Sequence, residues 1–437
     1  MIPPQPAPHR RVWRLAGPII LSNLSVPLLG MVDTAVVGHL PDPAYVGAVA
    51  VGATIFNFLY WGFGFLRMGT TGFAAQAYGA GDAVELAAVL ARALLIALAL
   101  AALLLLLQWP IRLVALSLIQ ASPTVAGLAG QFFAVRIWSA PATLANYALL
   151  GWLLGVQRPR TALALQLFLN GLNIVLCLAF VAGLGWGVPG VAAATAIAEY
   201  AGAGLGLWLV RRALPAEARP GRARVLARER LLALVRVNGD IFVRTLCLVF
   251  AFAYFTARGA AQGDVLLAAN AVLLNFQSLM AYALDGLAHA TEILVGSAIG
   301  ARDRAALSAA VRTATRWAAG IAVLFAAAYA LAGDRLVALF TDLAPVRAAA
   351  HAFLPWVAVS PLLSVWSFQL DGIFIGATRT AEMRNGMIIA LACYLAAATL
   401  LLPAFGNHGL WLAFLVLMVA RAVPLAIWYP RIGRAIG

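Results

Sequence analysis

The stretch "LARALLIALALAALLLLLQWP", from Leu90 to Pro110, decides the class of fold. It contains one charged residue, Arg92, and is otherwise almost entirely apolar. An apolar run of about 18 residues is long enough for a helix to cross the hydrocarbon core of a bilayer. Because lipid offers no hydrogen-bond partners to an exposed backbone, this run predicts a membrane-spanning α-helix.

The composition extends this prediction to the whole chain. Of its 437 residues, 64% are hydrophobic and 11% are charged, whereas a soluble domain carries about a quarter charged residues. The net charge is +14, and the sequence contains arginine but no lysine. In a soluble protein this charge would suggest nucleic-acid binding. Here the arginines gather in loops between apolar runs, so we expect a topology signal and no nucleic-acid partner.

Interruptions at Gly, Pro and Arg clusters divide the apolar sequence into twelve predicted spans. An all-α integral membrane protein is the only class that accommodates them. The predicted spans are 15–39, 44–68, 84–108, 123–150, 160–182, 188–210, 231–257, 265–294, 307–331, 348–375, 384–404 and 409–430.

The distribution of arginines orients these spans in the membrane. Most loop arginines lie on the side of the N-terminus, and the other side carries Arg112, Arg258, Arg335 and Arg347. Cytoplasmic loops are enriched in Lys and Arg. We therefore predict a multi-pass membrane protein with both termini in the cytoplasm.

Three matched pairs of segments indicate that the chain is a duplication. In each pair the second copy begins about 221 residues further along the chain. An even number of spans per half predicts parallel repeats, as in transporters that bind substrate between two lobes. The pairs are "AAQAYGAGD" (74–82) with "VGSAIGARD" (295–303), "LLGVQRPRT" (153–161) with "FIGATRTAE" (374–382), and "GVPGVAAATA" (187–196) with "GNHGLWLAFL" (406–415).

The predicted domains follow from this symmetry and from one hydrophilic segment near the midpoint. That segment, "RRALPAEARPGRARVLARER" (211–230), is charged and contains two prolines. We predict two pseudo-symmetric six-helix lobes, 1–212 and 231–437, joined by a cytoplasmic linker at 213–230, in a monomeric protein.

Asp33 is the acidic residue within the apolar stretch "LLGMVDTAVVGHL" (28–40). A charge at the bilayer centre costs roughly 3 kcal/mol on insertion scales. A carboxyl group held there can change its protonation state near neutral pH, as a proton-coupled carrier requires. Pro18 and Pro27 precede it and allow the helix to kink. Asp33 is therefore a candidate coupling residue, although burial against a structural Asn or Arg would also explain it.

Further polar residues at membrane depth are secondary candidates. Glu199 and the span-five residues Asn170, Asn173 and Cys177 belong to the first half, and Asn173 and Cys177 share a helix face. Asp371 is the deep acid of span ten. For each of these residues a structural role is the alternative to a functional one. The corresponding cations are Arg136, Arg244 and Arg421.

Two groups of charged residues recur at helical spacing in the second half. Asp285, His289 and Glu292 fall on one helix face and can share a proton or a hydrogen bond. Asp240 and Arg244 are four residues apart, and this spacing predicts an ion pair that lowers their insertion cost.

The sequence contains no motif of an enzyme. It has no Walker loop, GxSxG elbow or HExxH motif, so neither catalysis nor direct ATP drive is expected. Its three cysteines lie far apart in separate apolar runs, which predicts neither a metal site nor a cofactor. The lipid bilayer is an expected partner.

Taken together, several segments resemble the multidrug and toxic compound extrusion (MATE) family, in particular its DNA-damage-inducible F (DinF) branch. The resemblance covers essentially the whole chain in order. The segments are "PLLGMVDTAVVGHL", "AQAYGAGD", "NGLNIVL", "GVPGVAAATAIAEY", "NGDIFVRTL", "YALDGLAHATEILVGSAIGARD" and "LDGIFIGATRTAEMRNGM".

The resemblance implies an antiporter that exports amphipathic, often cationic, compounds by alternating access. It implies that Asp33 is the titrating carboxylate of the first helix, that Asn173 is its partner, and that Asp371 is a tenth-helix acid linked to cation coupling. Some relatives carry an Asp where this chain has Cys177, so this N-lobe has fewer acids. We therefore expect H+ as the coupling ion and regard Na+ coupling as the alternative. A lipid-linked oligosaccharide flippase of the same superfamily, a membrane-embedded enzyme and a non-transporting scaffold are the rival functions.

Overall fold

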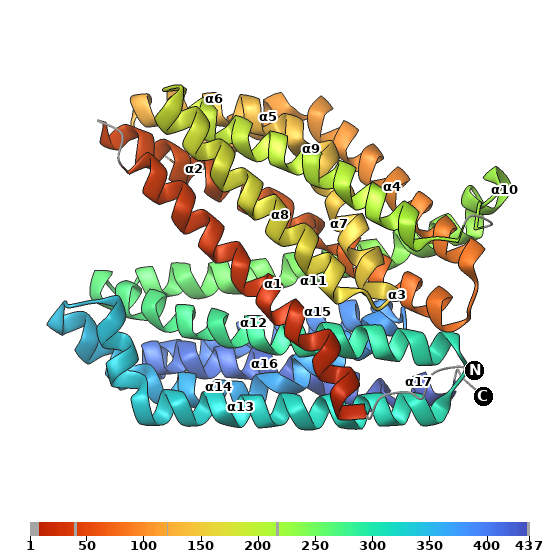
Figure 1. Ribbon diagram of the computed structural model, residues 1–437. Helices are drawn as coiled ribbons and strands as arrows, with labels where there is room; N and C mark the ends of the chain where they lie inside the picture. Colours follow the sequence, from red (N-terminus) through yellow and green to blue (C-terminus); the bar gives the residue numbers. More distant parts are fainter. Residues whose placement is uncertain (1–7, 39–41, 120, 216–217, 435–437) are drawn as a thin grey trace. The chain divides into compact units, whose positions relative to one another are not determined.

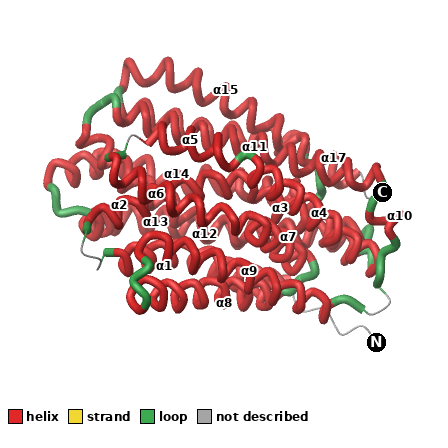
Figure 2. Tube along the Cα trace, turned by 90° about the horizontal axis from the view of Figure 1, so that it is seen from above, coloured by secondary structure: helices red, strands yellow, loops and turns green. Residues whose placement is uncertain are grey.

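The computed structural model describes residues 8–38, 42–119, 121–215 and 218–434, and it describes residues 26–34 and 37 by their backbone only. Within these ranges all regular structure is helical, and the connections between helices are short (Figure 2). Short connections are the expected result when apolar spans must turn at the membrane surface and re-enter the bilayer.

The helices follow one another along the chain as drawn in Figure 1. The first part comprises α1 (Pro8–Val37), α2 (Pro43–Trp61), η1 (Gly62–Gly64), α3 (Phe65–Gly79), α4 (Ala83–Leu106), α5 (Gln108–Ile119), α6 (Pro123–Arg136), η2 (Ile137–Ser139), α7 (Ala140–Gly155), α8 (Pro159–Cys177), the π-helical turn η3 (Leu178–Gly183) and α9 (Gly187–Ala213). The second part comprises α10 (Arg222–Val225), α11 (Arg228–Ala260), α12 (Asp264–Gly300), α13 (Arg304–Phe340), α14 (Ala344–Gly376), α15 (Thr380–Phe405), α16 (Asn407–Trp428) and α17 (Pro430–Arg434).

Ten helical segments of the described residues are long and apolar enough to cross a membrane. They coincide with ten of the predicted spans. The remaining two, 15–39 and 123–150, fall on α1 and on the continuous run α6–η2–α7. The predicted all-helical membrane fold is therefore confirmed. The short helix α5 was not predicted as a separate element, and Pro110 lies in its first turn, where proline is tolerated.

The chain divides into two compact units, each described here by itself. The N-terminal unit is Leu21–Asn238, and the C-terminal unit is Met1–Ile20 together with Gly239–Gly437. The divisions fall inside α1 and inside α11, so each of these helices contributes to both units. The predicted lobe boundaries at 212 and 231 stay a prediction.

The repeated turns adopt the same local structure in both units. Asp82 accepts a hydrogen bond from the backbone N–H of Glu85 at 2.8 Å and caps α4. Asp303 caps α13 by the same 2.8 Å bond to Ala306. The residue before each cap has a positive φ, and at Arg302 φ is 52°. An aspartate cap satisfies one of the unpaired N–H groups at a helix start, so the repeated "GxD" ending fixes where each span begins.

Glycines at repeated positions bring two pairs of helices close together. A Cβ atom at Gly151 of α7 would lie 2.4 Å from a backbone oxygen of α3, and one at Gly372 of α14 would lie 2.3 Å from a backbone oxygen of α12. The same approach recurs one turn later at Gly155 and Gly376. Small residues four apart allow helix backbones to pack tightly in a membrane. These contacts position α14, which carries Asp371.

The core of the C-terminal unit contains a pair of amide side chains that satisfy each other's hydrogen bonds. In this unit α12, α13, α14 and α16 run side by side (Figure 1). Asn270 of α12 and Asn407 of α16 exchange hydrogen bonds of 2.8 and 2.9 Å, and Trp411 donates a third bond to the Asn270 oxygen. Because these buried groups satisfy one another, they join α12 to α16 without an uncompensated polar atom.

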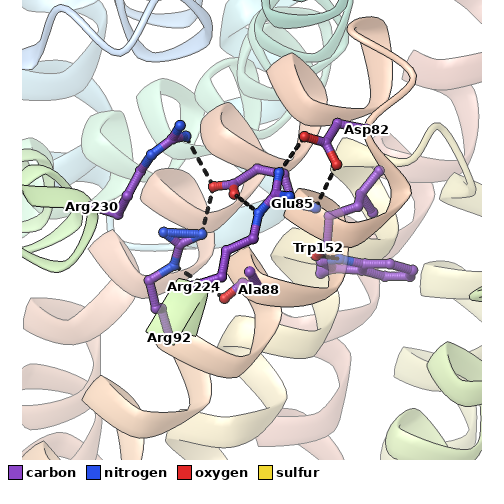
Figure 3. A network of polar contacts seen from close by, with 8 residues as sticks. Asp82, Glu85, Ala88, Arg92, Trp152, Arg224 and Arg230 are labelled. Carbon is purple, nitrogen blue, oxygen red and sulfur yellow. Dashed lines mark hydrogen bonds and ion pairs between the residues drawn. The ribbon is translucent and has the colours of Figure 1, made fainter. Parts of the chain in front are cut away.

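A charged network fixes the linker against the N-terminal unit (Figure 3). Glu85 of α4 bonds Arg92 at 2.5 Å, Arg224 of α10 at 3.1 Å and Arg230 of α11 at 3.2 Å. Arg224 also pairs with Asp82. The backbone N–H of Glu85 is the main cause that lowers the pKa of Asp82 below its usual value, and Arg224 lowers it further. Within the described part of the predicted linker, 213–215 and 218–230, two arginines are thus tied to α4 by ion pairs.

Candidate functional site

Asn173 of α8 is the most unusual polar residue of the N-terminal unit. It is 2% exposed, and its side-chain N–H group donates to the Thr195 hydroxyl of α9 at 2.9 Å. The Thr195 hydroxyl donates in turn to the backbone oxygen of Val191, so it can only accept from Asn173. This fixes the orientation of the amide. The Asn173 Oδ1 atom is buried and has no hydrogen-bond partner among the described residues.

Two neighbouring residues define the surroundings of Asn173 along α8. Asn170 donates to the Ser25 hydroxyl of α1 at 3.2 Å, so α8 and α1 meet within the N-terminal unit. Cys177 is fully buried where α8 gives way to the π-helical turn. Asp33 lies on α1 about two turns beyond Ser25. Its side chain lies outside the part of the chain that the structure describes.

Glu199 of α9 belongs to a second buried cluster of the same unit. Its carboxylate accepts a 2.7 Å hydrogen bond from Asn146 and lies 3.8 Å from the Arg136 guanidinium. The rings of Phe56 and Tyr60 lie 5.5 and 5.3 Å from the same guanidinium carbon. Aromatic faces attract a cation that has lost its water. The cluster therefore holds Glu199 with a cation and an amide donor.

Asp371 of α14 is the centre of the polar cluster of the C-terminal unit. Its Oδ2 atom accepts from Arg421 of α16 at 2.8 Å and pairs with Arg244 of α11. Arg421 also lies 5.8 Å from the Phe368 ring. Asp371 and Arg421 are 7% and 4% exposed. One carboxylate between the buried guanidinium of Arg421 and the partly buried one of Arg244 gives this triad a net charge of about +1 at neutral pH, because arginine stays protonated.

The predicted ion pair between Asp240 and Arg244 is wrong. Asp240 pairs instead with Arg384 of α15 at 2.5 Å and accepts from the Thr380 hydroxyl at 3.0 Å. Arg244 pairs with Asp371. The two carboxylates are similarly buried, with 12% and 10% of their side chains exposed, and each needs a cation to offset its desolvation. Helix α15 supplies that cation to Asp240 from Arg384, which leaves Arg244 for Asp371. Helix packing therefore overrides the local four-residue spacing.

The group formed by Asp285, His289 and Glu292 lies on α12. His289 Nδ1 and Glu292 Oε2 are 3.1 Å apart, and both side chains are buried. The hydrogen bond predicted within this group is therefore found between these two residues. Asp285 is half-buried and close enough to Arg421 to interact with it electrostatically. Asp285 thus borders the Asp371 triad.

The structure also supplies partners that the sequence did not identify. Asn146 and Thr195 complete the clusters around Glu199 and Asn173, and no sequence signal distinguished them from other polar span residues. The sequence identified Arg136 and Arg421 as cations at membrane depth, but it did not identify their partners. Among the described residues, no three His, Cys, Asp or Glu side chains gather as metal ligands would.

Buried ion pairs within apolar spans, two related halves and repeated small-residue contacts define a duplicated helical membrane protein of the transporter class. The sequence model of the MatE family matches the chain twice, over residues 18–179 and 241–402. The chain therefore belongs to the MatE family of membrane transporters, whose members are not enzymes. The double match supports the duplication inferred from the repeated segments.

Curated relatives agree with this assignment along most of the chain. DNA damage-inducible protein F of Escherichia coli (strain K12) is 46% identical over 96% of this chain and 92% of its own length. A probable multidrug resistance protein NorM of Deinococcus radiodurans is 28% identical over 98% of this chain and 96% of its own. These matches place the chain among the DinF and NorM relatives.

Solved structures share the fold. A MATE transporter crystallised in a bent conformation superposes with a TM-score of 0.89 at 23% identity, over 98% of this chain and 96% of that chain. A MOP superfamily transporter from Pyrococcus furiosus superposes with a TM-score of 0.87 at 21% identity, over 98% and 97% of the two chains. The chain is thus a multi-span membrane protein with the MATE fold.

Proposed function

We propose that this protein is a secondary active antiporter of the bacterial inner membrane. It exports amphipathic, often cationic, organic compounds in exchange for protons by alternating access. It works as a monomer with both termini in the cytoplasm. Membership of the MatE family and the names of the relatives, which are multidrug resistance and DNA damage-inducible proteins, support this function.

The observation that carries the proton-coupling proposal is the Oδ1 atom of Asn173, which is buried and has no partner among the residues that the structure describes. A buried acceptor without a donor costs about 1–3 kcal/mol. This oxygen can accept a hydrogen bond but cannot donate one. A protonated Asp33 brought to it supplies the missing donor, whereas an ionised Asp33 does not. The site therefore favours a bent α1 only when Asp33 carries the proton.

The remaining polar residues have supporting roles in this proposal. Cys177 stands where some relatives have a second acid, so one proton on Asp33 suffices for the N-terminal unit. Asp371 is the coupling carboxylate of the C-terminal unit. When ionised it holds Arg244 and Arg421. If Asp371 became neutral, the positive charges of Arg244 and Arg421 would lose their anion among the buried helices.

The test is efflux of a fluorescent organic cation from proteoliposomes under an imposed gradient. A pH gradient is expected to drive efflux, and Asp33→Asn is expected to abolish it. Asn173→Leu keeps the volume but removes the acceptor, and it should reduce proton-driven efflux about tenfold, as the loss of about 1.4 kcal/mol implies. Asn275→Leu is the matched control, because Asn275 is exposed and bonds its own helix.

Two alternatives predict different results in the same vesicles. Asp33 and the Asn173 oxygen are also ligand types that a hard cation prefers, so sodium coupling is the first alternative. Efflux that follows a sodium gradient and ignores a pH gradient would establish it and overturn proton coupling. Transbilayer movement of a fluorescent pyrophosphate-linked lipid, without efflux of organic cations, would instead support the flippase function.

A further inference from the structure

A surface groove of the C-terminal unit is lined by α13, α14 and α16 and has a volume of about 440 Å³. Its walls are almost entirely apolar, with contributions from Leu363, Trp366 and Val423. Trp366 and Val423 are each 49% exposed. The groove is therefore open along its length and suits an extended apolar chain rather than a compact polar ligand.

The length of the groove matches one leaflet of a bilayer. Its lining runs from Val419 of α16 to Tyr429, the residue that follows this helix, which is ten residues and therefore about 15 Å at 1.5 Å per residue. The hydrocarbon core of a bilayer is about 30 Å thick. An acyl chain that enters near Tyr429 would thus follow the groove to about the middle of the membrane.

A second cavity of about 300 Å³ adjoins the groove at Tyr429, which lines both. Its lining includes Arg304 and Ser308 of α13 and Arg434 of α17. Arg304 donates one hydrogen bond, to the backbone oxygen of Gly433 at 2.8 Å, and its other N–H groups remain for a ligand. Within the described ranges no carboxylate pairs with Arg304 or Arg434. As far as the structure describes it, this end of the groove therefore carries two arginines whose charges are not paired.

One buried donor inside the groove also lacks a partner. Gln369 of α14 is 2% exposed and lines the groove. Its oxygen accepts from Thr291, but its Nε2 group is buried and finds no acceptor among the described residues. Gln369 is seven residues before the end of α14, about 10 Å along the helix. A rotation of the side chain toward the groove would bring this N–H group to an ester carbonyl at the same level.

We infer that the groove and the basic cavity together bind one anionic phospholipid. The phosphate lies between Arg304 and Arg434, because guanidinium groups bind phosphate oxygens in bidentate fashion. The Gln369 amide donates to a glycerol ester, and an acyl chain occupies the apolar groove. Basic pockets beside membrane helices are known to select anionic headgroups. The site is separate from Asn173 and Asp371, so it goes beyond the proposed transport function.

The test is native mass spectrometry of the full-length protein in detergent with phosphatidylglycerol, or with phosphatidylcholine of the same acyl chains. Preferential retention of phosphatidylglycerol is expected. Each arginine near a membrane surface contributes about 5-fold to anionic-lipid binding, so Arg304→Gln with Arg434→Gln should weaken retention about 30-fold. Arg219→Gln with Arg222→Gln removes the same charge from the linker and should change retention little.

A second variant separates the groove from simple charge attraction. Ala426 is an exposed lining residue, so Ala426→Phe fills the groove without displacing the core. It should weaken phosphatidylglycerol retention at least about 5-fold with both arginines intact, while the unfolding temperature of the protein stays unchanged. Any one of three results would overturn the inference. These are equal retention of the two lipids, an equal loss of phosphatidylglycerol retention in the linker control, and undiminished binding by Ala426→Phe.

Discussion

Replacing Asp371 by asparagine tests whether the buried triad of the C-terminal unit is a balanced electrostatic structure. The substitution keeps the shape of the side chain and removes its charge. Arg244 and Arg421 both pair with this one carboxylate. The variant therefore places two guanidinium groups beside each other with no anion between them, in a site where Arg421 is 4% exposed.

The expected cost follows from this burial. Removing one member of a buried ion pair typically costs about 3–5 kcal/mol, because the remaining charge is desolvated and uncompensated. At about 2–4 °C per kcal/mol for a unit of this size, the unfolding temperature should fall by roughly 6–20 °C. Arg244→Gln should cost less, because it leaves the 2.8 Å pair between Asp371 and Arg421.

The assay is thermal unfolding of the purified protein in detergent, followed by tryptophan fluorescence. Asp342→Asn is the control, because Asp342 is fully exposed and its pair with Arg347 should contribute less than about 1 kcal/mol. The double variant Asp371→Asn with Arg244→Gln should lose at least about 1 kcal/mol less than the sum of the single losses. A loss at Asp371 no larger than at Asp342, or strict additivity, would refute the electrostatic account.

Two further predictions concern the packing and the caps. Gly372→Ala places a Cβ 2.3 Å from a backbone oxygen of α12 and should destabilise the protein by about 1–3 kcal/mol. In the control Gly320→Ala, the new Cβ has nothing within 4 Å and should stabilise the helix slightly. Equal unfolding temperatures of the two variants would contradict the close-contact interpretation. Asp82→Ala removes a helix cap and should cost about 1 kcal/mol at pH 7. Because the folded pKa of Asp82 is lowered, its contribution is fully present above its unfolded pKa of about 3.9 and is lost as the pH falls through the folded value. The difference in unfolding temperature between variant and parent should therefore shrink as the pH is lowered below about 3.9, and a difference that stays constant over this range would exclude the charge as its cause.

The sequence by itself determined the class of protein and the positions of its spans. Hydropathy is local information, and a bilayer leaves a long apolar segment such as Leu90–Pro110 only the helix. The duplication was visible for the same reason. A turn such as "GAGD" contains its own cap in Asp82, so its repeat at Asp303 forms the same turn without reference to the rest of the chain.

The partners of the buried charges were decided only by the tertiary structure. Asp240 and Arg244 have ideal spacing for a pair on one helix, yet each bonds a residue more than a hundred positions away. The spacing shows which side chains can meet on one helix, whereas the packing of the helices determines which charges do meet. The amide oxygen of Asn173 likewise has no partner in the described part of the chain, because Thr195, on the next helix, takes the other end of the amide. Which end of the amide is paired depends on how the helices pack, and no local pattern of residues predicts it.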